Sequence, residues 1–145
     1  NFDFIYLDIV GEGPEKKKLA DLIISENAEN ISLIGRKDKL STLNILNKSD
    51  GFIQLSSYEG MSFSILEAIK LNKPMILSNI KPNIETGKSA AIYVNYKSEE
   101  QIKNALKLIH DLQIRKQLSS EANFLSKYIY NSEISLQEYE NLLVT

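Results

Sequence analysis

The sequence lacks cysteine altogether and contains one histidine, His110, among its 145 residues. It therefore offers no disulfide, no thiolate nucleophile and no multi-histidine metal cluster. Its net charge of -2 gives none of the basic surface that nucleic-acid binding requires. No apolar run approaches the about 20 residues that span a bilayer. These shortages exclude thiol chemistry and a nucleic-acid partner, and they favour one soluble, cytoplasmic domain.

What the sequence does contain is an alternation of short apolar runs and helix-length segments. Hydrophobic residues make up 43% of the chain and charged residues 25%, as in an ordinary globular protein. The apolar runs are nearly continuous, which is typical of strands covered on both faces. They are Phe4–Val10, Ile31–Ile34, Gly51–Leu55, Pro74–Ser78 and Ala91–Val94. The alternation predicts the α/β class, with a parallel sheet and flanking helices.

The remaining segments carry apolar residues three and four positions apart, which places them on one buried face of a helix. Three such sets lie between the predicted strands: Leu19, Leu22 and Ile23; Leu40, Leu43 and Leu46; and Ile65, Ala68 and Ile69. Two longer stripes follow the last strand: Ile102, Ala105, Leu106, Ile109 and Leu112, then Leu118, Ala122, Leu125 and Ile129. A shorter stripe comprises Leu136, Tyr139 and Leu143. The chain is therefore expected to end in a helical tail.

Two short turns follow predicted strands, at the edge where parallel sheets bind ligands. Gly11 and Gly13 flank Glu12 directly after the first strand, and glycines let a backbone approach a ligand closely. Arg36 follows the second strand, where a cation can face a phosphate. Each turn also has a plainer interpretation, a tight turn for the first and a solvated turn for the second. The residues alone favour the plainer interpretation of each turn.

The loop after the third strand, Ser56–Ala68, carries more information, and its helix is expected to start near Ser62. Free amides at a helix start favour an anion such as a diphosphate. Glu67 lies about one turn further, where its carboxylate can accept hydrogen bonds from two ribose hydroxyls. The alternative for Glu67 is a capping box with Ser64. Glu59 either faces the group beyond the phosphates or is an exposed loop acid.

The segment Ser56–Ala68, with Glu59 and Glu67 as its two acids, resembles the signature of a large family of retaining glycosyltransferases. That family, the glycosyltransferase family 4 type, has an E-x7-E motif and the GT-B fold. Other segments resemble the same family in the same order: Leu7–Pro14, Ile31–Gly35, Lys73–Ser78 and Asn83–Glu85, the last as an acidic turn. The ordered set covers nearly the whole chain, so it is far more specific than the spacing of two glutamates.

The resemblance implies a role for each matched residue. Glu59 is implied to contact the donor sugar as the catalytic residue, and Glu67 to hold the ribose hydroxyls. The implied substrate-binding set is completed by Gly11, Gly13, Arg36, Gly60, Met61, Ser62, Phe63 and Leu66. Neither a metal nor a cofactor is implied, in line with the absence of an Asp-x-Asp motif. His110 is expected to be a surface or core-edge residue.

The resemblance also implies that residues 1–145 are a single Rossmann-like domain, the C-terminal nucleotide-sugar-binding domain of the enzyme. An N-terminal acceptor domain and the family's first βα unit are expected to precede Asn1, so the chain by itself is expected to be inactive. The implied partners are a UDP- or GDP-sugar donor and a glycan or lipid-linked acceptor. The Lys-, Ile- and Asn-rich composition is compatible with a bacterial source and with surface polysaccharide synthesis, in the cytoplasm or at the inner face of the membrane.

Three other functions compete with this one. A catalytically inactive module would keep the nucleotide pocket and transfer no sugar. A sugar-nucleotide epimerase of the same fold would need catalytic acids and a histidine that this chain does not supply. A flavodoxin-like signalling domain would need an acidic phosphorylation site clustered at strand ends, and no such cluster is seen.

Overall fold

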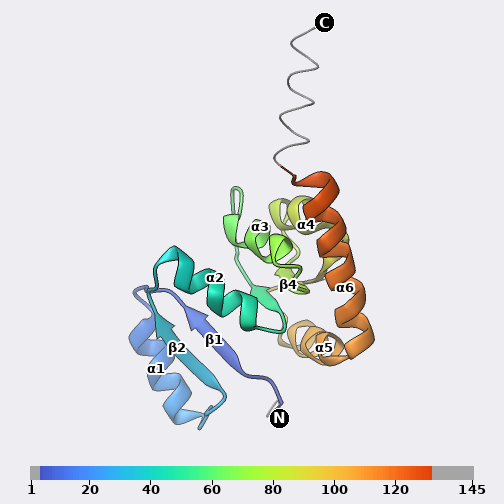
Figure 1. The fold of residues 1–145 in the computed structure, drawn as a ribbon. Coiled ribbons are helices and arrows are strands. Elements are labelled where there is room, and N and C mark those ends of the chain that lie inside the picture. The colour runs from blue at the N-terminus through green and yellow to red at the C-terminus, as the bar shows by residue number, and fades with distance from the viewer. Residues whose placement is uncertain (1–3, 132–145) are drawn as a thin grey trace, which may run out of the picture. The chain divides into compact units, whose positions relative to one another are not determined.

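The computed structural model describes residues 4–131. Within this range the chain forms two compact units, which meet in the sequence between Ile45 and Leu46 (Figure 1). One unit has a sheet of two strands and the other a sheet of three, and every strand pair is parallel. The α/β class with parallel strands and flanking helices is thereby confirmed. The single sheet expected from the alternation is present as two hydrogen-bonded ladders within these residues.

The first unit is built on a strand–helix–strand segment. Strand β1 (Leu7–Val10) pairs with β2 (Ile31–Gly35), and helix α1 (Lys16–Ser25) connects them. The register places Leu7 opposite Ile31. Because the strands are parallel, the turns that follow β1 and β2 lie at the same edge of the sheet.

Helix α2 (Lys39–Lys48) follows β2 and continues into the second unit. Its start is fixed by Asp38, whose carboxylate accepts hydrogen bonds from the Ser41 amide at 2.9 Å and the Ser41 hydroxyl at 2.7 Å. These bonds from Ser41 lower the pKa of Asp38 below its ordinary value. A carboxylate at this position satisfies amides that a helix leaves without partners.

Burial in the first unit is lower than the apolar stripes predict. Leu22 on α1 is 53% exposed, and Leu40 on α2 is 70% exposed. The prediction that both leucines are buried is therefore wrong. Helix α1 packs on a sheet of two strands, which offers too little surface to cover its whole apolar face. Leu40 lies in the first turn of α2, at the end of the helix.

The second unit has its strands in the order β3-β4-β5. These strands are β3 (Phe52–Gln54), β4 (Met75–Ser78) and β5 (Ala91–Val94). Every residue of the central strand β4 is buried. Side chains of a strand point alternately to the two faces of the sheet, so full burial means that both faces are covered.

Helices connect and cover these strands. Helix α3 joins β3 to β4, while α4 and the 3-10 turn η1 join β4 to β5. Helices α5 and α6 and the π-helical turn η2 follow β5, which confirms a helical tail after the last strand. Their bounds are α3 Phe63–Lys70, α4 Lys81–Gly87, η1 Lys88–Ala90, α5 Glu99–His110, α6 Leu112–Phe124 and η2 Leu125–Ile129.

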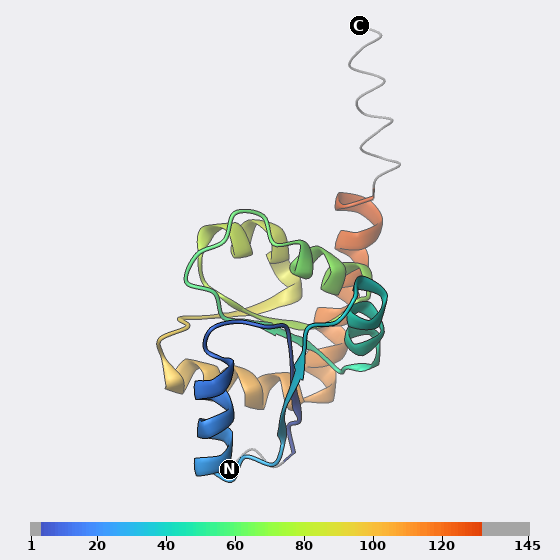
Figure 2. The same cartoon turned by 90° about the vertical axis from the view of Figure 1, so that its left-hand side faces the viewer.

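The two faces of the three-stranded sheet have separate cores. Met75 and Leu77 of β4 pack with α3 and α6, where Ile65 and Ala122 are fully buried. Ile76 of the same strand packs in the other core with apolar residues of α5. Figure 2 shows α5 on the opposite side of these strands from α3 and α4. The buried face that the spacing predicts for α3 is confirmed, since Ile65, Ala68 and Ile69 are all inaccessible.

One segment differs in type from the expectation. Asn83–Glu85, expected as an acidic turn, lies within α4. Pro82 suits the first turn of a helix, because an amide proton at that position would have no acceptor within the helix and proline has none. The Asn83 side chain donates to the Ser78 hydroxyl at 2.8 Å, and the Tyr130 hydroxyl donates to the Thr86 carbonyl at 2.8 Å. These hydrogen bonds connect helix α4 to Ser78 of β4 and to Tyr130.

The stripe of Leu136, Tyr139 and Leu143 lies outside the described residues. Between residues 4 and 131, no helix is long and apolar enough to cross a membrane.

Candidate functional site

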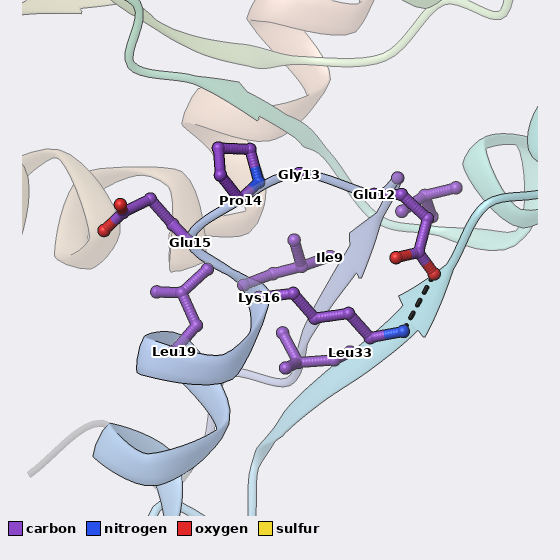
Figure 3. A pocket seen from close by; sticks show the side chains of 10 residues that line it. Ile9, Glu12, Gly13, Pro14, Glu15, Lys16, Leu19 and Leu33 are labelled. Carbon is purple, nitrogen blue, oxygen red and sulfur yellow. Dashed lines mark hydrogen bonds and ion pairs between the residues drawn. The ribbon is translucent and has the colours of Figure 1, made fainter.

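The turn after β1 borders a hollow on the surface of the first unit (Figure 3). The hollow has a volume of about 330 Å³, and its walls include Ile9 and Leu33 from the strands and Leu19 from α1. Gly11 and Gly13 lie at its edge. Gly11 has a φ of 138°, a backbone conformation that residues with a side chain rarely adopt. The glycine turn is therefore tight, as expected, and it also borders a space that a ligand can enter.

The Arg36 turn lies beside the glycine turn. The Gly11 amide donates to the Gly35 carbonyl at 2.9 Å. Glu12 connects the two turns through a hydrogen bond with the Arg36 backbone amide. The pKa of Glu12 lies below its ordinary value, mainly because its carboxylate accepts a hydrogen bond from the Lys16 ammonium at 2.8 Å, and the bond from Arg36 adds to the effect. Arg36 is exposed, so an anion can reach its guanidinium. The structure brings the predicted residues of both turns to one edge of the first unit.

Glu59 lies in the loop between β3 and α3, and neighbouring side chains hold its carboxylate. The Gln54 side-chain amide donates to Glu59 Oε1 at 2.7 Å, and the Ser56 hydroxyl donates to the same oxygen at 2.6 Å. Glu59 is half-buried. It is therefore an oriented carboxylate at the carboxyl end of β3, and the interpretation as a freely exposed loop acid is wrong.

The start of α3 has an unusual cap. Ser62 is the N-cap, but its hydroxyl makes no bond to the helix amides and instead donates to Gln54 Oε1 at 3.0 Å. The amides of the first turn, which begins at Phe63, therefore lack a side-chain cap and carry the positive end of the helix dipole. This arrangement suits an anion. Ser64 lies inside the helix, so the capping box proposed for Ser64 and Glu67 is wrong.

The remaining predicted residues divide by exposure. Gly60, Met61 and Phe63 are exposed, with 68% of Met61 and 71% of Phe63 accessible. Leu66 and Glu67 are half-buried in α3. Together with Glu59 and Ser62, they occupy one end of the second unit, where β3 ends and α3 begins. That these residues bind a donor stays a prediction, which the resemblance implies.

Sequence reasoning missed Gln54. This side chain contacts Glu59, Ser56 and Ser62, so it lies at the centre of the polar group. A signal was available, because Gln54 is the one polar side chain in the run from Gly51 to Leu55. In an otherwise apolar strand, a polar side chain needs a partner, and here it has several.

The structure offers no obvious metal centre in its described part: no group of three His, Cys, Asp or Glu side chains within residues 4–131 is placed to hold a metal ion. His110 is exposed and is the last residue of α5, in agreement with the expectation of a surface residue.

Comparison with known proteins gives a family match and curated relatives. The family model described as "Glycosyl transferases group 1" matches residues 2–123. The poly(ribitol-phosphate) alpha-N-acetylglucosaminyltransferase of Staphylococcus aureus (strain COL) is 28% identical over 141 residues. This match covers 92% of the chain and 28% of the relative, so the chain spans well under half of that enzyme's length.

Solved structures share the fold. Anabaena Alr3699/HepE in complex with UDP has a TM-score of 0.80 at 19% identity, over 99% of this chain and 42% of that one. The pneumococcal O-GlcNAc transferase GtfA in complex with UDP and GlcNAc has a TM-score of 0.75 at 20% identity, over 94% of this chain and 28% of that one. At these identities the likeness shows a common architecture.

Proposed function

This chain belongs to the glycosyl transferases group 1 family, with the GT-B fold, and we propose that it is the donor-binding domain of a nucleotide-sugar-dependent transferase. The observation that carries the proposal is the end of β3, where the oriented carboxylate of Glu59 adjoins the uncapped start of α3. We place residues 1–145 as the C-terminal donor-binding domain of a longer enzyme of the E-x7-E retaining type. An N-terminal domain then supplies the acceptor site, and the chain by itself transfers no sugar.

The donor's diphosphate is proposed to bind at the N-terminus of α3. The amides around Gly60, Met61, Ser62 and Phe63 are the donors, and the Ser62 hydroxyl does not compete for them because it bonds to Gln54. In the reaction, the bond from the anomeric carbon to the diphosphate breaks, a bond to the acceptor oxygen forms with the same anomeric configuration, and the acceptor hydroxyl proton passes to the departing diphosphate. Negative charge develops on the leaving diphosphate, and preorganised amides stabilise that charge.

The two glutamates have different proposed roles. The hydrogen bonds from Gln54 and Ser56 both end on Oε1 of Glu59, and we assign Oε2 to the contact with the donor sugar. Glu67 accepts hydrogen bonds from the ribose hydroxyls, with Leu66 packing nearby. Gly11, Gly13 and Arg36 are also assigned to donor binding, Arg36 through its exposed guanidinium. The proposed reaction uses neither a metal nor a cofactor.

The proposed donor is a UDP-linked hexose or N-acetylhexosamine. UDP is favoured over GDP because both similar structures described above contain UDP. N-acetylglucosamine is favoured by the names of the Staphylococcus and pneumococcal proteins. The proposed acceptor is a glycan or a lipid-linked glycan of a bacterial surface polymer, since the Staphylococcus relative acts on poly(ribitol-phosphate). Such a reaction belongs in the cytoplasm or at the inner face of the membrane.

The test is sugar transfer by the full-length protein that carries this chain. We expect Glu59→Gln to lower kcat by about 100-fold or more, because it removes charge aimed at the reacting sugar. The matched control is Glu100→Gln, at an exposed position of α5, which should transfer sugar at the wild-type rate. An unimpaired Glu59→Gln enzyme contradicts the assignment of Glu59.

A further inference from the structure

Gln54 joins three parts of the second unit through one side chain. It is the last residue of β3, and its amide nitrogen donates to Glu59 Oε1 at 2.7 Å in the following loop. Its amide oxygen accepts a hydrogen bond from Ser62, the N-cap of α3, at 3.0 Å. Strand, loop and helix are therefore connected by a single amide group.

The chemistry of the partners fixes the orientation of this amide. An ionised carboxylate can only accept hydrogen bonds, so the Gln54 nitrogen must face Glu59. The oxygen then faces Ser62, whose hydroxyl donates to it. Only 7% of Ser62 is exposed, so the residue to which the Gln54 oxygen bonds is itself held in packed structure. Both ends of the amide are satisfied, and turning it over would place its oxygen against a carboxylate.

We infer that Gln54 is a positioning residue that fixes the Glu59 carboxylate for contact with the donor. The inference rests on the proposed function, because it takes Glu59 to be the residue that meets the sugar. Glu59 lies on a loop, and a loop carboxylate has several accessible rotamers. The bonds from Gln54 and Ser56 confine Oε1 to one place. Confinement before the donor arrives lowers the cost of reaching the reactive geometry.

The first variant for the test is Gln54→Met, measured by steady-state transfer in the full-length protein. Methionine keeps the length of the side chain and cannot donate to a carboxylate. We expect kcat to fall about 10- to 100-fold, with a much smaller change in the KM for the donor. The matched control is Gln117→Met, at an exposed position of α6, which should leave both constants unchanged.

A second variant, Gln54→Glu, separates positioning from a general loss of structure. Its carboxyl group has the same shape as the amide and can donate to Glu59 only while protonated. Two carboxyl groups at hydrogen-bond distance do not both ionise readily, so the pKa of the introduced group is raised. Transfer by Gln54→Glu should therefore recover as the pH falls through that raised pKa. Wild type and Gln54→Met should show no such recovery, because neither carries the extra titrating group.

The outcomes distinguish the inference from the function on which it rests. Low kcat for Gln54→Met together with recovery of Gln54→Glu at low pH supports the inference. Two outcomes overturn the inference alone, both with a wild-type protein that transfers sugar. One is an unimpaired Gln54→Met variant, and the other is a Gln54→Glu variant with the pH profile of wild type. A wild-type protein that transfers no sugar from any nucleotide-sugar overturns the proposed function and the inference with it.

Discussion

Gly87, the last residue of α4, lies where the structure has no room for a side chain. A Cβ at this position would lie 2.7 Å from Leu77 Cδ1 and 2.7 Å from the Tyr93 hydroxyl. Leu77 is fully buried in the core, and the Tyr93 hydroxyl donates to the Lys88 carbonyl at 2.8 Å. Gly87→Ala must therefore displace the Leu77 side chain and the hydrogen-bonded Tyr93 hydroxyl.

The expected loss follows from three contributions. Overpacking a core costs about 1–3 kcal/mol, and disturbing the Tyr93 hydrogen bond costs about 1 kcal/mol more. Alanine gains up to about 1 kcal/mol over glycine from helix propensity, and the φ of Gly87 is -77°, which alanine adopts without strain. The free energy of unfolding should therefore fall by about 1–3 kcal/mol.

The assay is urea unfolding of the 145-residue chain, followed through the amide NMR signals of β4, which report on the second unit. Gly60→Ala is the control, because a Cβ at Gly60 has nothing within 4 Å. The control should stay within about 0.5 kcal/mol of wild type. A Gly87→Ala chain as stable as the control would refute the close packing around Leu77 and Tyr93.

Two further predictions concern the same unit. Burial, with a smaller contribution from Tyr130, raises the pKa of Tyr93 to about 12. Because an unfolded tyrosine titrates near pH 10, the stability linked to Tyr93 is present below about pH 10 and is lost as the pH rises through about 12. The measurement is the difference in phenolate absorbance between wild type and Tyr93→Phe, and a midpoint near pH 10 would contradict the prediction. Asp111 caps α6 by accepting hydrogen bonds from the amides of Gln113 at 2.8 Å and Ile114 at 3.1 Å. Asp111→Ala should lower the free energy of unfolding by about 0.5–2 kcal/mol in urea titration, whereas Asp111→Asn should keep most of the stability that the cap contributes. Equal losses for the two variants would rule out the cap.

The strands of the second unit were predictable because none of their residues is exposed. Ala91–Val94 has the predicted bounds, and the buried strand β4 lies within the predicted run Pro74–Ser78. A strand covered on both faces must be apolar throughout, so its composition identifies it. The helices α3, α5 and α6 were found for a similar reason, since each places an apolar stripe in one of the two cores.

The incorrect structural predictions have physical causes that the spacing of apolar residues does not show. Helix α4 has no apolar stripe, and it is held by the Tyr130 hydroxyl, which comes from far along the chain. Leu22 and Leu40 belong to apolar stripes, yet the first unit does not bury them. Spacing shows which face of a helix is apolar, but the surface available to cover that face depends on the rest of the fold.

The candidate site was only partly readable from the sequence. Glu59 and Glu67 stand out by spacing and by resemblance, and the helix start at Ser62 by the glycine before it. The hydrogen bonds from Gln54 to Glu59 and Ser62 could not be predicted from the sequence, because they depend on which way the side chains of the strand and the loop point. A polar residue in an apolar strand signals that a partner exists, whereas the identity of the partner requires the structure.

The most direct test of the proposed donor site is equilibrium binding of nucleotides to the full-length protein by calorimetry. UDP, GDP and their common sugar conjugates would be titrated into wild type, Glu67→Ala and the exposed control Glu100→Ala. We predict that UDP and a UDP-sugar bind, that Glu67→Ala weakens binding about 10- to 100-fold by removing charged hydrogen bonds to the ribose, and that the control binds like wild type. Binding that is absent for every nucleotide, or equally strong in Glu67→Ala, would contradict the donor site at the start of α3.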